Sequence, residues 1–191
     1  MKVPFHFATA RRFVFVALVV GASWAAGLHA DRALRAALLR HACIAATAIC
    51  PDHAAALTGT AADRDTAIYR HFRERLAQIR DALPDCRFAY LMARRPDGAV
   101  VFLADGEPED SPDFSPPGQV YTNRTATLLA ALDQGQAGIE GPLADPWGVW
   151  VSAMAPLALP DRGRPIVLGL DVDARRWKWI VVSQAAVPAI L

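Results

Sequence analysis

The chain has 191 residues, of which 53% are hydrophobic and 20% are charged, and its net charge is +1. This length accommodates one domain of ordinary size with a further segment at each end, and the apolar excess favours a membrane segment. No basic block interleaved with aromatic residues occurs, which argues against a nucleic-acid-binding protein.

An uncharged apolar run covers residues 13–28, with arginines on both flanks. As a helix it would rise about 24 Å, slightly less than a full membrane span of roughly 20 residues, so long side chains at its ends would complete the crossing. The same run, preceded by Lys2, Arg11 and Arg12, also fits a cleavable secretory signal. We favour an uncleaved anchor in residues 1–30.

The orientation of the anchor in the membrane is inferred from the basic residues beside it and from the length of the domain that follows. Three basic residues precede the apolar run and three follow it closely, so their count is balanced, but Arg11 and Arg12 adjoin the run and long domains translocate largely regardless of charge. We therefore expect a cytoplasmic N-terminus, an inner-membrane location and a domain of residues 31–176 facing the periplasm.

The C-terminal segment, residues 177–191, is apolar and begins with Trp177 and Trp179 around Lys178. Tryptophans of this kind are typical of membrane interfaces, so we interpret the segment as the first part of a second, truncated membrane helix. The alternative is a helix or strand of the domain core.

The three cysteines do not form an evident disulfide. Cys43 and Cys50 lie seven residues apart on an expected helix, which separates them by about 10 Å, too far for a disulfide. Cys86 could pair with either, but no metal-binding spacing occurs, and we favour buried free thiols.

Two amphipathic helices are expected before the sheet. Apolar residues recur at steps of three and four over residues 31–49, and the helix should end at Pro51. A second helix is expected over residues 66–83, with Asp65 or Thr66 as its cap and Pro84 as its stop.

Beyond residue 86 the pattern changes to strands. Residues 87–95 and 99–105 flank a Pro-Asp-Gly turn and predict a hairpin, and residues 147–157 and 165–173 predict a second one. Residues 106–120 contain four prolines and predict an ordered loop over a pocket, followed by a short helix near residues 128–132. Helices followed by an antiparallel sheet indicate an α+β fold.

Four segments, taken in order, carry a resemblance to a known family: CRFAYLMARRPDGAVVFLADGEPED, SPPGQVY, EGPLADPWGVWVSAMAPL and VLGLDVDARRW. Over roughly residues 56–177 the chain resembles the Cache-like, PAS-like extracytoplasmic sensor domains of bacterial transmembrane histidine kinases and diguanylate cyclases. The resemblance implies a long helix from the membrane, an antiparallel sheet of about five strands in PAS topology, and a last strand leading to a second membrane helix. It also implies a homodimer formed through the first helix, and an output domain that has no counterpart in this sequence.

In such sensors the ligand lies on one face of the sheet under the loop and short helix. One face of the first strand carries Phe88, Tyr90, Met92 and Arg94. Tyr90 would give an aromatic wall, and Arg94 a cationic end for a carboxylate. The alternative is that Tyr90 belongs to the core and Arg94 is solvated.

Three carboxylates need an explanation. Asp105 ends the second strand and is followed by Glu107. Asp171 lies in an otherwise apolar strand, where a carboxylate is costly unless it is paired. Asp171 could bind an amine of the ligand, bond to Arg94 or Ser152, or face solvent. In the sensors that the chain resembles, acidic residues near this position hold the amino group of amino-acid ligands.

Aromatic residues complete the candidate pocket, although they could equally fill a core. The predicted ligand-binding residues are Tyr90, Met92, Arg94, Asp105, Tyr121, Trp147, Trp150, Ser152 and Asp171.

The sequence favours a binding module over an enzyme. All five histidines precede the sheet, and no nucleophile with a base, phosphate-binding loop or metal-ligand spacing occurs, so we expect no catalytic residue, cofactor or metal. We expect an input module that senses a small molecule, such as an amino acid or a carboxylate. The alternatives are a structural or interaction module regulated by a partner protein, and a secreted soluble binding protein.

Overall fold

The computed structural model describes residues 5–157 and 164–186. The chain forms two compact units, one of residues 1–36 with 177–191 and one of residues 37–176. The second unit contains the whole β-sheet and every predicted ligand-binding residue.

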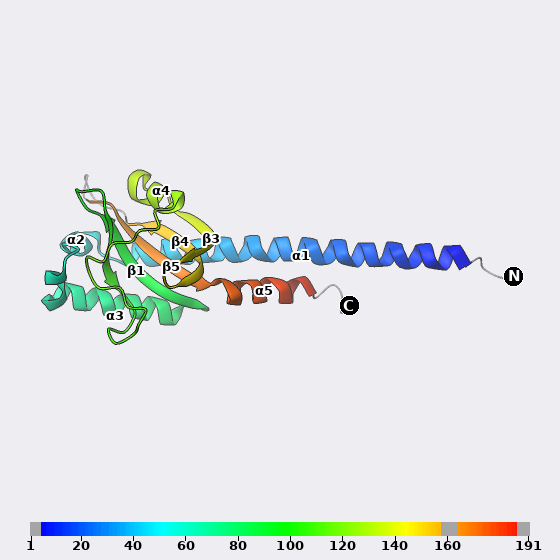
Figure 1. The fold of residues 1–191 in the computed structure, drawn as a ribbon, viewed down its shortest axis with the longest axis horizontal. Coiled ribbons are helices and arrows are strands. Elements are labelled where there is room, and N and C mark those ends of the chain that lie inside the picture. Colours follow the sequence, from blue (N-terminus) through cyan, green and yellow to red (C-terminus); the bar gives the residue numbers. More distant parts are fainter. Residues whose placement is uncertain (1–4, 158–163, 187–191) are drawn as a thin grey trace. The chain divides into compact units, whose positions relative to one another are not determined.

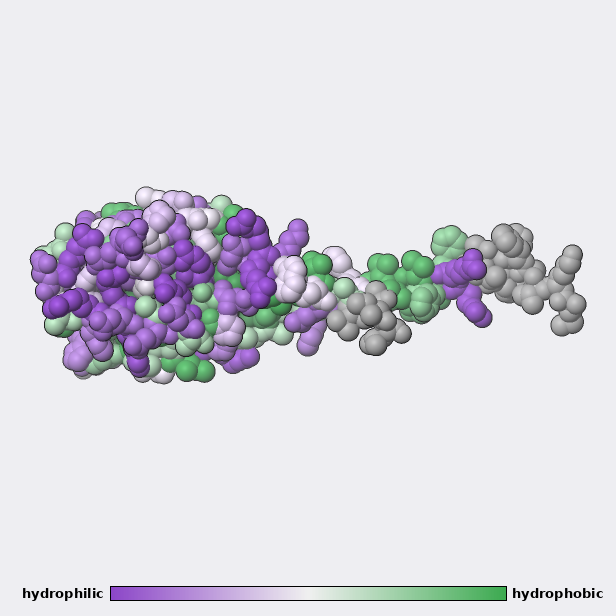
Figure 2. Space-filling view, turned by 90° about the horizontal axis from the view of Figure 1, so that it is seen from below, coloured by the Kyte–Doolittle hydropathy of each residue, from purple (hydrophilic) through white to green (hydrophobic). Residues whose placement is uncertain are grey.

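Helix α1 (Phe5–Thr47) runs without interruption through the predicted membrane run and most of the helix expected over residues 31–49. Its portion from Arg11 onward is long and apolar enough to cross a membrane, with a mean hydropathy of 1.8 in its most apolar window. An apolar band on this helix is visible as green atoms in Figure 2. Length and composition fit both a membrane anchor and a signal sequence.

Helix α5 (Ala174–Ala186) begins directly after the last strand, and the remaining residues 187–191 of the expected second membrane helix lie outside the described part. Its Trp177 is buried, and the indole Nε1 donates a hydrogen bond to Asp31 Oδ1 at 2.8 Å. The Arg35 guanidinium lies 5.6 Å from the centre of the same ring. Trp177 is thus held by α1, whereas Trp179 is 62% exposed.

A five-stranded antiparallel sheet forms the centre of the second unit and confirms the predicted α+β fold (Figure 1). Its spatial order is β2-β1-β5-β4-β3. The strands are β1 (Cys86–Arg94), β2 (Val100–Asp105), β3 (Gly138–Asp145), β4 (Gly148–Pro156) and β5 (Ile166–Asp173). Both predicted hairpins occur, although the turn between β4 and β5, residues 158–163, lies outside the described residues.

Two helices cover different strands of this sheet (Figure 1). Helix α3 (Ala67–Ala82) packs against β1 and β2, and α4 (Ala126–Gln134) packs against β3 and β4. The predicted cap of α3 is Thr66, whose hydroxyl accepts the backbone N–H of Tyr69 at 3.1 Å. Thr125 caps α4 in the same way, and Gly135 ends that helix with a φ of 63°, a left-handed conformation that glycine adopts without strain.

Two short elements before α3 are absent from the sequence prediction, namely α2 (Pro51–Ala55) and a 3₁₀ helix, η1 (Ala61–Asp65). Asp63 holds this connection in place, because its buried carboxylate accepts the backbone N–H groups of Thr58 and Gly59 at 3.0 and 2.8 Å.

One apolar core joins α4 to the sheet, and several predicted site residues belong to it. The buried members are Phe88, Tyr90, Met92, Val100, Phe102, Tyr121, Leu128, Ala131, Leu132, Trp150, Met154 and Val167. Trp147 packs against this cluster from its edge. The candidate site is therefore an extension of a core face rather than a separate cleft.

The cysteines Cys43, Cys50 and Cys86 are free, as predicted, but the expectation that all are buried is wrong. Cys43 and Cys50 are exposed, because they fall on the outer face of α1 and just beyond its end. Cys86 is partly buried, its thiol donates to the carbonyl of Phe88 at 3.2 Å, and burial raises its pKa to about 12. Its thiol is therefore protonated and unreactive at neutral pH.

Candidate functional site

A small cavity lies beneath the segment that connects β2 to α4, residues 106–125, which we call the cover loop. It is lined by Phe88, Tyr90, Phe102, Asp105, Asp113, Ser115, Tyr121, Asp145, Trp147 and Asp171. The unfilled space is about 290 Å³, part of it open to solvent, but only about 20 Å³ admits the centre of a water-sized sphere. Because the cavity is narrow, a ligand larger than a few atoms requires movement of the cover loop or of the aromatic side chains that line the cavity.

Five of the nine predicted residues meet at this cavity. Tyr90 comes from β1, Asp105 from the end of β2 and Asp171 from β5, while Tyr121 and Trp147 come from the cover loop and the β3–β4 turn. Residues more than 80 positions apart in sequence thus line one hollow, because β1 and β5 are neighbours in the sheet.

The structure places the other four predicted residues outside the cavity lining. Met92 and Trp150 belong to the buried core behind it. Ser152 lies directly opposite Asp171 on β4 and hydrogen-bonds to its carboxylate. Arg94 forms an ion pair with Asp133 at 3.0 Å, because α4 ends with that aspartate beside the end of β1. Among the residues that the structure describes, none gives the cavity lining the expected cationic end for a carboxylate.

Five lining residues were not predicted, namely Phe88, Phe102, Asp113, Ser115 and Asp145. The alternation of the strand places Phe88 on the face of Tyr90, but Phe88 is not among the predicted ligand-binding residues. Asp113 and Ser115 lie in a proline-rich loop without periodicity, where the sequence gives no direction for a side chain.

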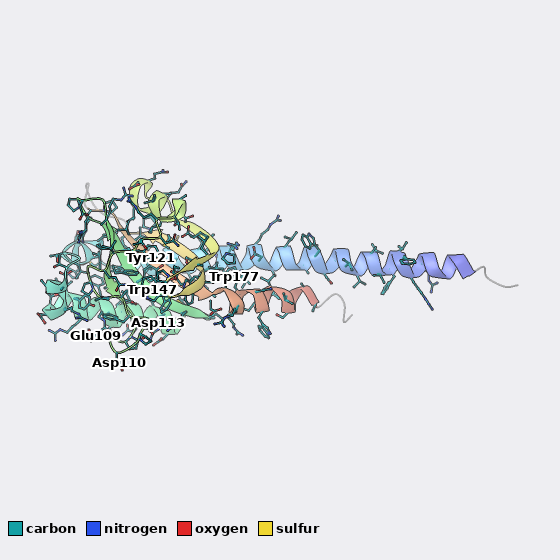
Figure 3. All side chains as sticks on the ribbon, in the orientation of Figure 1. Glu109, Asp110, Asp113, Tyr121, Trp147 and Trp177 are labelled. Carbon is teal, nitrogen blue, oxygen red and sulfur yellow. The ribbon has the colours of Figure 1, made fainter. Side chains whose placement is uncertain are left out.

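Aromatic rings form one side of the cavity. Tyr121 and Trp147 are stacked, with ring centres 6.1 Å apart and planes inclined by 22°, and Figure 3 shows them side by side. Phe102 presents its ring edge-to-face to Tyr90, Tyr121 and Trp147 at 5.4, 5.9 and 5.7 Å. Such pairs fix the orientations of the rings that line the hollow.

Asp171 forms the floor. The Tyr90 hydroxyl donates to its Oδ1 at 3.2 Å, and Ser152 supplies a second hydrogen bond. Burial raises the pKa of Asp171 to about 7, an effect that these hydrogen bonds only partly offset. The alternative in which Asp171 bonds to Ser152 is thus present in the structure, whereas the pairing with Arg94 is not.

Gly169 allows Tyr90 to reach Asp171. Gly169 on β5 is paired with Tyr90 on β1. A Cβ at position 169 would lie 2.1 Å from Cε2 of the tyrosine ring. Only glycine leaves room for the ring to cross β5, so Gly169 positions the phenol over the floor of the cavity.

Asp145 orients the rim. Its Oδ1 accepts the backbone N–H groups of Trp147 and Gly148 at 2.9 and 3.0 Å, and the indole Nε1 of Trp150 at 2.9 Å. One carboxylate thus fixes the β3–β4 turn and the placement of Trp147 at the mouth of the cavity.

Asp105 pins the cover loop at two points. Its Oδ1 accepts the N–H of Glu107 at 2.9 Å, and its Oδ2 accepts the N–H of Ser115 at 2.8 Å. Burial raises the pKa of Asp105 to about 6 in spite of these two bonds.

Glu107 anchors the same loop to α3 and β1. It accepts hydrogen bonds from Arg87 at 2.7 and 3.1 Å, from Arg80 at 3.1 Å and from Ser111 at 2.9 Å. Burial opposes its charge, but the bonds from Arg87 and Ser111 outweigh burial and lower its pKa.

We expect Glu107→Ala to lower the free energy of unfolding by about 2 kcal/mol, because it leaves two arginines without their shared buried partner. Urea denaturation followed by tryptophan fluorescence measures this change. Glu109→Ala is the matched control, since Glu109 lies in the same loop, pairs with Arg73 at 2.7 Å and is 51% exposed; it should cost less than about 1 kcal/mol. Equal losses in the two variants would contradict the anchoring role of Glu107.

Comparison with known proteins supports the fold. No family model matches the chain, and no curated protein matches it. Among solved structures, the chain is similar to the ligand-binding domain of the Campylobacter jejuni chemoreceptor Tlp3 in complex with L-valine, with a TM-score of 0.56 and 11% sequence identity. The similarity covers 94% of this chain and 68% of that one. At this level of identity the similarity shows the fold alone: the chain has the fold of a ligand-binding sensor domain.

Proposed function

We propose that residues 31–176 form the small-ligand-sensing input module of a transmembrane signalling receptor. The observation that carries the proposal is the cavity under the cover loop, where Tyr90, Tyr121 and Trp147 face two buried carboxylates. Apolar hollows with a few convergent polar groups are the usual form of small-molecule sites. The similarity to a chemoreceptor domain that binds L-valine supports this assignment.

The route of the signal follows from the connection between β5 and α5. Asp171 lies in β5, and two residues later Asp173 accepts the backbone N–H groups of Arg175 and Arg176 at 2.6 and 3.3 Å, which starts α5 without a loop. A ligand that preferred one position of Asp171 would shift the start of this helix.

The remaining parts of the proposal concern the cellular setting. We propose that residues 1–30 anchor the chain in the inner membrane, that the module faces the periplasm, and that residues 177–191 begin a second membrane helix. Two copies would associate through α1, as in the histidine kinases and diguanylate cyclases that the sequence resembles. The module itself would bind its ligand without catalysing a reaction.

Thermal denaturation of the full chain in detergent, screened against amino acids, carboxylates and amines, tests ligand binding. At least one compound should raise the Tm, and Trp147→Ala should abolish that rise because it removes one aromatic wall. Trp179→Ala is the matched control, since Trp179 is exposed on α5 and does not line the cavity. A rise that persisted in Trp147→Ala would place the ligand elsewhere.

A second candidate function is an interaction module that binds no small molecule, and the narrowness of the hollow favours it. If no compound in the screen raises the Tm of the chain, this second function replaces the first.

A further inference from the structure

We propose that the ligand is a small organic ammonium ion that carries no carboxylate. This inference rests on the proposed function, since it concerns the chemistry of the same cavity. It differs from the expectation raised by the sequence, which favoured an amino acid or a carboxylate.

The first argument is the sign of the charges in the wall. Four carboxylates line the cavity, from Asp105, Asp113, Asp145 and Asp171. Among the residues that the structure describes, no lysine, arginine or histidine contributes to this lining. A carboxylate ligand would therefore lie among like charges in a partly desolvated hollow, which is strongly unfavourable.

The second argument is how these carboxylates are satisfied. Within the described part of the chain, Asp105 and Asp145 accept hydrogen bonds from uncharged backbone and indole N–H groups, and Asp171 accepts them from hydroxyl groups. These hydrogen bonds offset the cost of burial only in part at Asp105 and Asp171, and no ion pair between a cationic side chain and the three aspartates occurs among the described residues. Such a wall attracts a cation that can approach it.

The nearby arginines are already engaged. Arg87 binds Asp113 at 2.8 Å and Glu107 at 2.7 Å, so its charge is shared by two carboxylates. Arg94 is held by Asp133. Neither guanidinium is available to hold a ligand carboxylate in the way that the sequence suggested.

The third argument is the aromatic side of the cavity. The stacked pair of Tyr121 and Trp147, together with Phe102 edge-to-face beside both and Tyr90 edge-to-face beside Phe102, contributes four aromatic rings to the lining of the hollow. Rings in such a box bind ammonium groups through cation–π attraction, most strongly when water is excluded. Carboxylates on the floor and rings on the wall thus select the same ligand charge.

Four compounds that share a branched carbon skeleton isolate this selectivity: isobutylammonium, its neutral analogue isobutanol, its anionic analogue isobutyrate, and L-valine, which adds a carboxylate to isobutylammonium. Titration calorimetry with the full chain in detergent measures their affinities. We expect isobutylammonium to bind about tenfold or more tightly than L-valine and isobutanol, and isobutyrate not to bind.

Two variants locate the binding. Asp171→Asn and Trp147→Ala should each weaken isobutylammonium binding about tenfold or more, whereas Arg94→Gln should leave it unchanged. Circular dichroism of each variant establishes that it is folded before its affinity is compared.

The outcomes separate the two proposals. Tighter binding of L-valine or isobutyrate, abolished by Trp147→Ala, would overturn the ammonium assignment and leave the sensor function standing. Equal binding of isobutanol and isobutylammonium would also overturn it, since charge would play no part. Absence of binding by isobutylammonium overturns the inference, and the sensor function then depends on the wider thermal screen alone.

Discussion

Titration of Asp171 alone is expected to lower the free energy of unfolding by about 4 kcal/mol as the pH rises from about 4 to about 8, and Asp171→Asn is expected to remove this contribution. The cause is the buried carboxyl group of Asp171, whose pKa is raised to about 7 against an ordinary value of 3.8. Its proton is held more tightly in the folded chain than in the unfolded one.

The direction follows from this difference. Below the pKa that Asp171 has in the unfolded chain, its carboxyl group is protonated in both states, and its contribution to the free energy of unfolding is fully present. As the pH rises through the pKa that Asp171 has in the folded chain, the folded chain must hold a buried charge, and this contribution is lost. Asp105, with a pKa of about 6, acts in the same direction.

The surroundings of Asp171 do not reverse this trend. The charges of Asp145 and Glu140 on β3 raise its pKa further, while hydrogen bonds from Ser152 on β4 and Tyr90 on β1 lower it only in part. Carboxylates with lowered pKa values, such as Glu107, lose their contribution only in more acid solution, outside the interval in which Asp171 titrates.

Urea denaturation at a series of pH values measures the effect, with the full chain in detergent. The wild-type chain should lose stability from mildly acid to mildly alkaline solution, and Asp171→Asn, which keeps hydrogen bonds to Tyr90 and Ser152 without a charge, should be the more stable protein at about pH 8. Asp173→Asn is the matched control on the same strand and should retain the wild-type slope, because the pKa of Asp173 is lowered instead. A wild-type stability that stays level, or the full wild-type slope retained in Asp171→Asn, would contradict the raised pKa of Asp171.

The elements that the sequence predicted well are those with strong local signals. Helix α3 begins after Thr66 and ends just before Pro84, because a capping hydroxyl and a proline fix both ends. The hairpin of β1 and β2 follows from two apolar runs around a Pro-Asp-Gly turn. In these cases, a few adjacent residues determine the backbone.

Strand β3 shows where local signals fail. It contains Gly138, Gly141 and Pro142, lies at the edge of the sheet, and has no fully buried residue, so it lacks the apolar alternation that identifies a strand. Its place in the sheet depends on pairing with β4, which the sequence of β3 alone does not encode.

The predictions for the candidate site also differ according to whether they depend on one strand or on the tertiary fold. Strand parity and the cost of a buried charge identified Tyr90 and Asp171, because both arguments need only the strand itself. The partner of Arg94 depends on where α4 ends, and Asp133 occupies that position. Which opposite charge reaches a given arginine is a property of the tertiary fold, so the cationic end of the pocket could not be decided from spacing.

The second large effect is expected at Asp105, where Asp105→Ala should lower the free energy of unfolding by about 3 kcal/mol. The substitution leaves the buried N–H groups of Glu107 and Ser115 without their acceptor and frees the cover loop from the end of β2. Hydrogen–deuterium exchange of these two amides should accelerate more than exchange within β1, because the loop opens before the sheet does.

The matched control is Asp97→Ala. Asp97 also accepts the N–H two residues ahead, from Ala99 at 3.0 Å, but its side chain is 54% exposed in the β1–β2 turn, so water replaces it as an acceptor. Asp105→Asn should lie between wild type and Asp105→Ala, since an amide keeps one acceptor oxygen for two donors. If Asp105→Ala and Asp97→Ala lost the same stability, or if the amides of Glu107 and Ser115 exchanged no faster, the cover loop would be held by its other contacts, such as those of Glu107, and Asp105 would not control its opening.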